Sequence, residues 1–305
     1  MRAEQRVRVE VEGRGLELSH LDKVLYPAVG FTKGEVIDYY TRISEALLPH
    51  LRDRPLTRIR CPNGVEGNSF FEKNAPAGTP EWVRRETLPA PGSSKGREML
   101  DYVVCDDLPT LVWLANLAAL ELHTPQWRVG RHPDLMVLDL DPGAPAGLAE
   151  CCQVALLLRE RLAADGIASY PKTSGRKGMQ LCCPVSGRQP ADVVSGYARR
   201  IAEELARELP ESVTAQMAKR LRPGRVFIDW SQNNAAKTTV TPYSLRAQPT
   251  PSVSTPVTWA EVEAAAGGAS GAVRRFLATE VLDRVEEHGD LLTPLLRPGP
   301  ELPGS

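Results

Sequence analysis

The stretch from Leu135 to Gly143, LMVLDLDPG, constrains the chain most, because four apolar residues run directly into two carboxylates. Side chains two residues apart on a β-strand point to the same face, so Asp139 and Asp141 are expected to project together. Pro142 and Gly143 end the strand. Parallel carboxylates on a rigid strand suit a hard divalent cation. The residues alone leave a second interpretation open, in which the strand ends in a solvated acidic turn.

Composition describes an ordinary globular protein of 305 residues, with 42% hydrophobic residues, 25% charged residues and a net charge of −1. This charge argues against an arm that coats nucleic acid, although local basic clusters remain compatible with it. No stretch is long and apolar enough to span a membrane, and the N-terminus is charged without an apolar signal region. The six cysteines lack zinc-site CxxC spacing. We therefore expect a cytoplasmic protein with reduced, buried thiols.

Helix and strand signals alternate along the chain. Capping-box patterns begin two predicted helices, one at Thr32 with Glu35 and one at Thr258 with Glu261. The first of these helices is expected to end near His50. Other predicted helices span 108–123, 148–165, 191–209 and 272–286. Predicted strands are a hairpin over 7–18 and the segments 56–60, 167–170, 179–185 and 226–230.

These patterns predict an α/β or α+β fold with its catalytic half around the central acids. We expect an N-terminal lobe over about 1–134, a catalytic palm over about 135–290, and a frayed tail over 297–305. A mobile loop is expected over 93–97, where serine, glycine and basic residues gather. No linker is evident, so the chain is interpreted as a single compact module.

A third aspartate, Asp229, ends the apolar strand VFID. Three carboxylates on neighbouring strands can hold two divalent ions, which stabilise the attacking and leaving oxygens of phosphoryl transfer. Taken alone, Asp229 is more often a turn former at the end of a strand, but its combination with Asp139 and Asp141 favours the metal-ligand interpretation. The loop Thr173 to Gly178, TSGRKG, offers backbone N–H groups and cations to phosphates, although it lacks Walker A spacing.

The N-terminal lobe combines cations with neighbouring aromatic rings, a pattern typical of proteins that hold single strands and gapped ends. Arg60, Phe70 and Phe71 are candidate DNA contacts. Adjacent strand residues face opposite ways, so at most one phenylalanine need be buried, and we expect that one to be Phe70. His123 and Arg246 are candidate phosphate contacts. The alternatives are a structural histidine and a solvated arginine.

The chain resembles the polymerase domain of bacterial ligase D and its stand-alone relatives, the archaeo-eukaryotic-type primase-polymerases. The resemblance rests on a set of blocks in the family's order. They are DKVLYPAVGFTKGEVIDYY, RPLTRIRCPNG, FFEKNAP, LELHTPQW, LDLDPG, KTSGRKGMQL and VFIDWSQNNAAKTTVTPYSLR. The implied fold is a primase-like palm with an RRM-like sheet, beside an N-terminal α/β subdomain.

The resemblance implies that Asp139, Asp141 and Asp229 form a catalytic triad holding two Mn²⁺ or Mg²⁺ ions. The primer 3′-hydroxyl would attack the α-phosphate of an incoming nucleotide, with ribonucleotides preferred. Lys23 and Lys33 match lysines that bind the 5′-phosphate of a downstream strand. Further residues match positions that contact the nucleotide: Phe71, His123, Ser174, Gly175, Lys177, Gly178 and Arg246. Gln232 and Lys237, which lie in the SQN…K loop of the motif, are further candidate DNA contacts.

The chain departs from the family pattern at several positions. Gln180 stands where a histidine is usual and can still donate a hydrogen bond to phosphate. Ile59 replaces a frequent lysine, and the loop 89–97 is expected to differ in length. These departures favour a stand-alone paralogue that works beside a separate ligase, with Ku as a further partner.

The predicted function is template-dependent gap filling or primer extension at gapped or recessed DNA ends with a 5′-phosphate, in non-homologous end joining or another repair pathway. The enzyme is expected to be a monomer in the nucleoid region of a bacterial cytoplasm. One alternative is a DNA-end-binding scaffold without polymerase activity. Another is a metal-dependent phosphohydrolase that uses the same acids.

Overall fold

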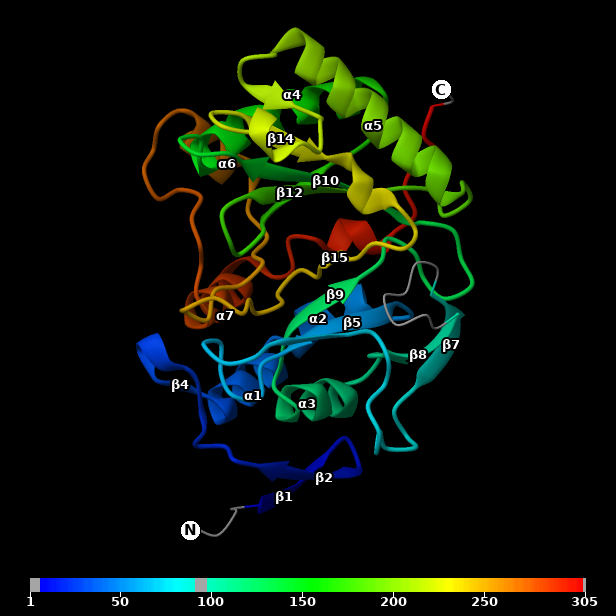
Figure 1. The fold of residues 1–305 in the computed structure, drawn as a ribbon, viewed down its shortest axis with the longest axis vertical. Coiled ribbons are helices and arrows are strands. Elements are labelled where there is room, and N and C mark those ends of the chain that lie inside the picture. Colours follow the sequence, from blue (N-terminus) through cyan, green and yellow to red (C-terminus); the bar gives the residue numbers. More distant parts are fainter. Residues whose placement is uncertain (1–5, 91–97, 304–305) are drawn as a thin grey trace. The chain divides into compact units, whose positions relative to one another are not determined.

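The computed structural model describes residues 6–90 and 98–303, and its backbone contacts divide the chain into two compact units (Figure 1). Unit 1 takes the chain as far as Thr124, together with Tyr243–Val253 and Leu277–Gly289. Unit 2 comprises Pro125–Pro242, Ser254–Phe276 and the segment that begins at Asp290. Two later segments of the chain therefore return to unit 1.

Unit 1 is built on an antiparallel sheet in which β5 (Pro55–Arg60) pairs with β9 (Ala119–Thr124) and β8 (Met99–Val104). The strand β7 (Arg85–Pro89) extends the sheet beside β8, and β6 (Phe70–Glu72) also pairs with β5. Two hairpins precede the sheet. Their strands are β1 (Arg6–Val11), β2 (Arg14–Ser19), β3 (Val24–Tyr26) and β4 (Phe31–Thr32). The expected loop at 93–97 lies outside the described residues.

Four helices belong to unit 1, with bounds α1 (Lys33–Arg42), α2 (Ser44–Leu51), α3 (Leu108–Asn116) and α7 (Ala278–His288). The predicted capping box is present, because the Thr32 hydroxyl accepts from the Glu35 N–H and the Glu35 carboxylate accepts from the Thr32 N–H. The single helix expected to run to His50 is instead divided at Ile43. The last helix begins at Ala278, six residues later than the pattern predicted.

The prediction of one helix over 108–123 is wrong. The helix α3 ends at Asn116, Ala118 adopts a left-handed φ of 56°, and β9 then begins at Ala119. The run is almost wholly apolar, so its pattern does not distinguish a buried helix from a buried strand. Pairing with β5 decides the outcome, because it satisfies the backbone of 119–124 within the sheet.

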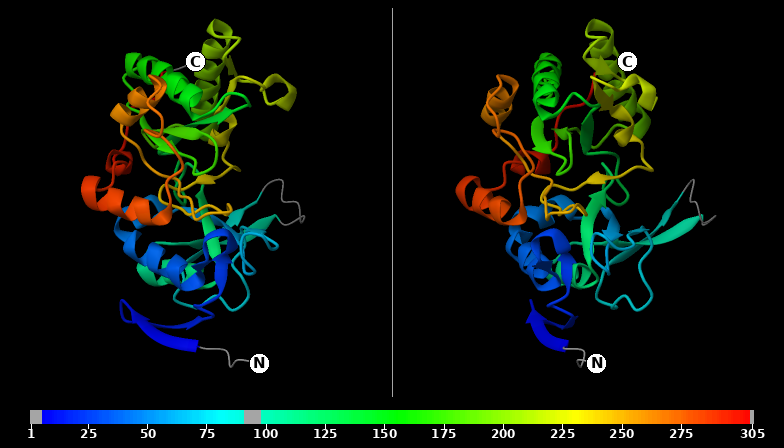
Figure 2. Two further views of the ribbon diagram at one scale, coloured as in Figure 1. Left: turned by 90° about the vertical axis from the view of Figure 1, so that its left-hand side faces the viewer. Right: turned by 60° about the vertical axis from the view of Figure 1, so that its left-hand side comes forward.

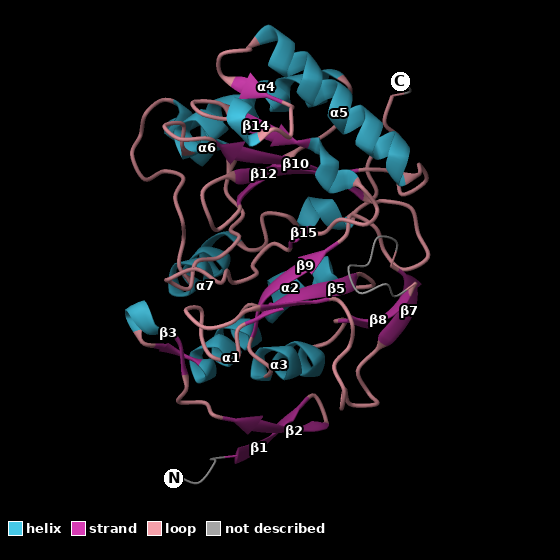
Figure 3. Cartoon of the chain, in the orientation of Figure 1, coloured by secondary structure: helices cyan, strands magenta, loops and turns pink. Residues whose placement is uncertain are grey.

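Unit 2 is built on a five-stranded sheet in the order β11 (Tyr170–Thr173), β12 (Met179–Pro184), β10 (Leu135–Pro142), β14 (Val226–Asp229) and β13 (Val213–Thr214). All neighbours are antiparallel except β13 and β14, which are parallel. The long helices α4 (Leu148–Ala164) and α5 (Ala191–Glu208) pack against β10, and α6 (Trp259–Ala266) packs against α4 (Figure 2). Strands and helices of both units are distinguished by colour in Figure 3.

The two units also contain short elements. They are β15 (Thr239–Val240) and the 3₁₀ turns η1 (Pro27–Val29), η2 (Lys219–Leu221), η3 (Trp230–Asn233) and η4 (Thr293–Leu296). No helix among the described residues is both long enough and apolar enough to traverse a membrane.

The described part of the C-terminal tail does not fray as predicted. Leu302 is buried, and its N–H donates to the Gln189 side-chain oxygen Oε1 at 2.7 Å. Glu301 forms an ion pair with Arg188 at 3.0 Å. Gly299 lies so close to β12 that a β-carbon would sit 2.0 Å from the Pro184 carbonyl oxygen. Residues beyond Pro303 lie outside the description.

Candidate active site

The three predicted aspartates lie on two adjacent strands of unit 2. In the register of β10 and β14, Asp139 is directly opposite Asp229, and Asp141 follows two residues along β10. Opposed residues of an antiparallel pair share a face of the sheet, as do residues two apart on one strand. Leu138 and Leu140 point to the other face and are fully buried. The sheet thus gathers the three carboxylates on one face.

The electrostatics show that these carboxylates repel one another. Burial, together with the negative charges of Asp141 and Asp229, raises the pKa of Asp139 to about 7. A hydrogen bond from Gln180 and the positive charge of Lys172 act in the opposite direction on the same pKa. Ionisation of all three carboxylates on a rigid sheet is favourable only when a positive charge lies beside them.

The donor chemistry fits a hard divalent cation, since carboxylate oxygens are the ligands that Mg²⁺ and Mn²⁺ prefer. Within residues 6–90 and 98–303, no three His, Cys, Asp or Glu side chains are already gathered at metal-ligating positions. The Asp229 carboxylate is instead held by Ser231, through its N–H at 3.0 Å and its hydroxyl at 2.5 Å, and by Gln232 Nε2 at 2.8 Å. The predicted loop residue Lys237 in turn donates to the Ser231 hydroxyl.

A row of polar residues crosses four strands of this sheet. Lys172 on β11 is opposite Gln180 on β12, and Gln180 is opposite Asp139 on β10, which is opposite Asp229. The Lys172 ammonium is buried and donates to Gln180 Oε1 at 2.5 Å, Ser254 Oγ at 2.6 Å and the Val240 carbonyl at 3.1 Å. Because an ammonium only donates, Gln180 turns its oxygen to Lys172 and its NH₂ group to Asp139.

Sequence reasoning missed Lys172 because it ended the preceding strand at residue 170. In the structure β11 spans Tyr170–Thr173, so Lys172 and Thr173 belong to the strand. The glycine-rich turn could have indicated that the strand extends to Lys172, since a hairpin turn has paired strands directly on both of its sides.

The predicted phosphate loop lies between β11 and β12. The Ser174 hydroxyl accepts from the N–H groups of Arg176 and Gly178 at 3.3 Å each, and Gly175 adopts a φ of 70°. A β-carbon on Gly178 would lie 2.1 Å from the Leu140 carbonyl oxygen, so only glycine fits there. Lys177 Nζ donates to the Pro142 carbonyl at 3.1 Å. These contacts therefore fix the loop beside the end of β10 that carries Asp139 and Asp141.

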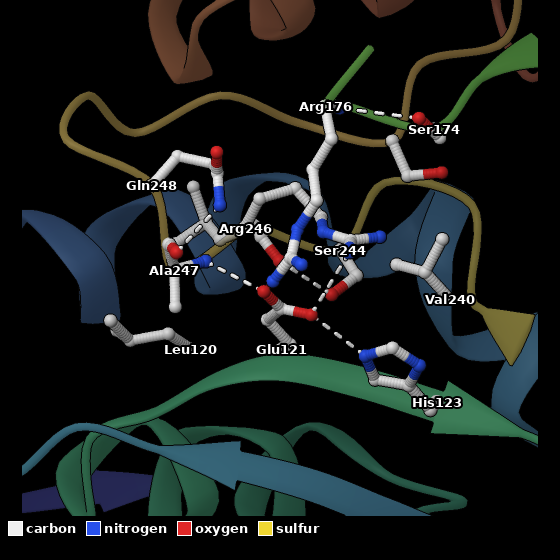
Figure 4. Close-up of polar contacts among 12 residues, drawn as sticks. Leu120, Glu121, His123, Ser174, Arg176, Val240, Ser244, Arg246, Ala247 and Gln248 are labelled. Atoms are coloured by element: carbon white, nitrogen blue, oxygen red, sulfur yellow. Dashed lines mark hydrogen bonds and ion pairs between the residues drawn. The ribbon is translucent and has the colours of Figure 1, made fainter. Parts of the chain in front are cut away.

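His123 and Arg246 are brought together in unit 1 by a residue that the sequence reasoning missed (Figure 4). Glu121 lies two residues before His123 on β9 and is fully buried. Its Oε2 atom is 2.8 Å from His123 Nε2 and 3.3 Å from an Arg246 guanidinium nitrogen, and its Oε1 accepts from the Ala247 N–H at 2.9 Å. The alternation of Glu121 and His123 was concealed by the wrong prediction of a helix.

Three buried tyrosines hold the segment that carries Arg246. Tyr39 donates to the Tyr243 carbonyl at 2.8 Å, and Tyr26 donates to the Arg246 carbonyl at 3.1 Å. Tyr40 donates to the Leu120 carbonyl at 2.6 Å and accepts from the Leu245 N–H at 3.2 Å. Burial raises the pKa of all three phenols, so they remain protonated donors. Arg246 is therefore carried by a fixed backbone.

The two predicted phosphate-binding lysines also lie in unit 1. Lys33 Nζ donates to the Ser19 carbonyl at 2.6 Å, and Lys23 Nζ donates to Asn63 Oδ1 at 3.0 Å. Burial, together with the positive charge of Lys23, lowers the pKa of Lys33 to about 8. The two ammonium groups are thus close enough to repel one another, which an anion between them would relieve.

The expected burial of Phe70 is wrong, because Phe70 is 46% exposed and Phe71 is 63% exposed. Both belong to β6, a three-residue strand attached only to the end of β5 among the described strands, so neither face of it is covered. Arg60, opposite Phe70, is tied into the sheet through the Leu117 carbonyl at 2.8 Å and Glu72 at 2.9 Å. The exposed rings are therefore better placed than Arg60 to meet a ligand.

Comparison with known proteins identifies the family. A family model described as LigD, primase-polymerase domain, matches residues 32–292. This chain belongs to that family. Membership implies nucleotidyltransferase activity and the use of divalent metal ions.

Relatives among curated proteins carry names that refer to end joining. The chain is 42% identical to the multifunctional non-homologous end joining protein LigD of Mycolicibacterium smegmatis, over 92% of this chain and 36% of that protein. It is 34% identical to the bifunctional LigD of Bacillus subtilis, over 90% of this chain and 43% of that protein. The chain thus spans less than half the length of these relatives.

A solved structure shows the same fold. The polymerase domain of Mycobacterium tuberculosis Ligase D, determined in complex with DNA, superposes with a TM-score of 0.86 at 40% identity. The match covers 92% of this chain and 98% of that one. The expected mixed α/β architecture of a ligase D polymerase domain is confirmed.

Proposed function

We propose that this chain is a template-dependent primase-polymerase that adds nucleotides, with ribonucleotides preferred, to a primer 3′-hydroxyl at short gaps or broken DNA ends. The observation that carries the proposal is the strand register that sets Asp139 opposite Asp229 with Asp141 on the same face. Three convergent carboxylates beside a glycine-rich loop are what nucleotidyl transfer requires, and family membership adds independent support.

Asp139, Asp141 and Asp229 would hold two Mn²⁺ or Mg²⁺ ions, which when bound supply charge neutralisation for the triphosphate and acidify the primer hydroxyl. Gln180 keeps the Asp139 carboxylate oriented through its amide NH₂ group. Gln232 and Ser231 orient Asp229 in the same way, with Lys237 behind Ser231. Ser174, Gly175, Lys177 and Gly178 would accept the triphosphate, with Lys177 supplying positive charge.

Unit 1 supplies the groups that would receive nucleic acid and nucleotide. Lys23 and Lys33 present two mutually repelling ammonium groups to a 5′-phosphate, which would give charge-assisted hydrogen bonds. The exposed ring of Phe71 would stack on a base, with Phe70 and Arg60 as neighbouring contacts. His123 and Arg246 would contact the nucleotide phosphates.

The relatives' names support a place in bacterial end joining for this chain as well. We propose that it acts as a monomer in the bacterial cytoplasm, near the nucleoid, on gapped or recessed DNA. A DNA ligase would seal the product, and Ku would deliver the ends.

Primer extension on gapped DNA with Mn²⁺ tests this function, with ribonucleotides compared against deoxyribonucleotides. We expect template-directed addition that is faster with ribonucleotides. Addition that ignores the template base, or no addition of either nucleotide, would contradict the proposal. Tight binding to DNA ends without addition would identify the chain as an end-binding scaffold instead.

A further inference from the structure

Glu121 is a buried carboxylate to which the proposed function assigns no role. It lies in the middle of β9, opposite Ile59 of β5, and its side chain is fully buried. Ionised carboxylates are seldom buried so completely unless cations and hydrogen bonds surround them. The groups around Glu121 must therefore compensate its buried charge.

The two oxygens of Glu121 have different partners. Oε1 accepts from the backbone N–H of Ala247, whereas Oε2 faces the side chains of His123 and Arg246 (Figure 4). The first contact ties β9 to the segment that returns to unit 1. The second contact holds an imidazole and a guanidinium, which come from distant parts of the sequence, on one oxygen atom.

We propose that Glu121 is a positioning residue that holds His123 and Arg246 together as one receptor for the nucleotide triphosphate. This inference rests on the nucleotide contacts proposed above for those two residues. The bond to His123 Nε2 fixes the plane of the ring, and the bond to Arg246 fixes one edge of the guanidinium. The buried negative charge also stabilises the Arg246 guanidinium beside it.

If Glu121 had only a structural role, that role would depend on its contact with the Ala247 N–H. One substitution separates this contact from the contacts with His123 and Arg246. Glu121→Gln has nearly the same shape and can still accept the Ala247 N–H through its carbonyl oxygen. Its NH₂ group would then face Arg246, which can only donate, and His123 Nε2, which could meet it only as an acceptor. The substitution therefore keeps the backbone contact, loses the ion pair with Arg246 and removes the acceptor that Glu121 offers to His123.

The experiment uses the full chain with Mn²⁺ and ATP. It measures the KM and kcat for addition of the nucleotide on gapped DNA, and separately the Kd for direct binding of ATP. For Glu121→Gln we expect KM and Kd to rise roughly tenfold or more, because hydrogen bonds that involve charged groups are lost. We expect kcat to change by less than about threefold, because Glu121 does not touch the reacting atoms.

Coupling between substitutions tests whether Glu121 acts through its two partners. In a chain that already carries His123→Ala and Arg246→Ala, adding Glu121→Gln should raise Kd no further. Asp106→Asn is the matched control, since Asp106 is another carboxylate of unit 1 that pairs with an arginine, Arg84, at 2.7 Å. We expect this control to leave the Kd for ATP unchanged.

An unchanged Kd in Glu121→Gln, or an equal rise in the chain without His123 and Arg246 side chains, would overturn the positioning role. If Glu121→Gln does not fold, Glu121→Asp keeps the charge on a shorter side chain, and an unchanged Kd there would overturn the role equally. Wild-type protein that binds ATP but adds no nucleotide would refute the proposed polymerase function while Kd still reports on Glu121. Wild-type protein that does not bind ATP would refute both.

Discussion

The three site aspartates are held close to one another at a cost in folding free energy. The pKa of Asp139 is raised to about 7 by burial and by the charges of Asp141 and Asp229, so the folded state resists its ionisation. A carboxyl whose pKa is raised on folding stabilises the folded state only while it is protonated. Its contribution is therefore lost as the pH rises from about 4 to about 7. A bound cation would reverse this effect.

Asp139→Asn is expected to abolish nucleotide addition and to raise the melting temperature of the metal-free protein, because it removes one of three repelling charges. Mn²⁺ should raise the melting temperature of the wild type, and EDTA should reverse that rise. The variant should respond much less to Mn²⁺. Thermal melts at pH 7 with Mn²⁺ or EDTA measure this, and an equal response of both proteins would contradict the assigned metal site.

Lys33 carries a second pH dependence at the residue scale. Its pKa is lowered to about 8 by burial and by Lys23, so the ammonium loses its proton as the pH rises through that value. The affinity for gapped DNA with a 5′-phosphate should therefore fall between pH 7 and pH 9. Affinity for the same gap without the phosphate is the control and should change less. A pH-independent ratio of the two affinities would argue against Lys33 as a phosphate ligand.

At the scale of elements, the hairpin of β11 and β12 positions the phosphate loop and the row from Lys172 to Asp229. It can do so because Gly178 lets the loop approach the backbone of β10 closely. The tertiary contact, rather than the turn alone, makes glycine necessary at this position, since its φ is not in the left-handed region.

Gly178→Ala is expected to destabilise the protein by about 1–3 kcal/mol, as overpacking in a tight core does. It should also reduce nucleotide addition, because the loop must move away from Leu140. Urea denaturation and primer extension measure the two effects. Gly196→Ala is the matched control, since its β-carbon meets nothing within 4 Å in the middle of α5. A smaller loss in Gly178→Ala than in this control would show that the contact is not tight.

At the scale of the whole molecule, the candidate groups are divided between the two units. The aspartates and the phosphate loop belong to unit 2, whereas the lysines, Phe71, His123 and Arg246 belong to unit 1. The chain passes from one unit to the other several times, so neither unit is a continuous piece of sequence. This division predicts that substitutions can separate the functions.

Asp141→Ala in unit 2 should abolish nucleotide addition and leave the affinity for gapped DNA within about threefold of the wild type. Lys23→Ala with Lys33→Ala in unit 1 should remove the preference for a 5′-phosphate while addition on an unphosphorylated gap persists. Fluorescence anisotropy and primer extension on the same substrates measure both. Loss of both activities in both variants would contradict the separation.

Sequence by itself determined the features that depend on a few neighbouring residues. The capping boxes at Thr32 and Thr258 form as predicted, and α4 and α5 lie within two residues of their expected bounds. Asp139 and Asp141 share a face because alternation is a property of any extended strand. Motif resemblance correctly identified the family, since the blocks recur in order along the chain.

The tertiary structure alone decided which distant residues meet. Residues 119–124 became a strand because β5 was available to pair with them, and Phe70 remained exposed because β6 covers so little of the sheet. Glu121 and Lys172 gained their partners only when strands far apart in sequence came into register. Local propensity acts over a few residues, whereas burial and the hydrogen bonds of buried charges depend on long-range packing that no local pattern encodes.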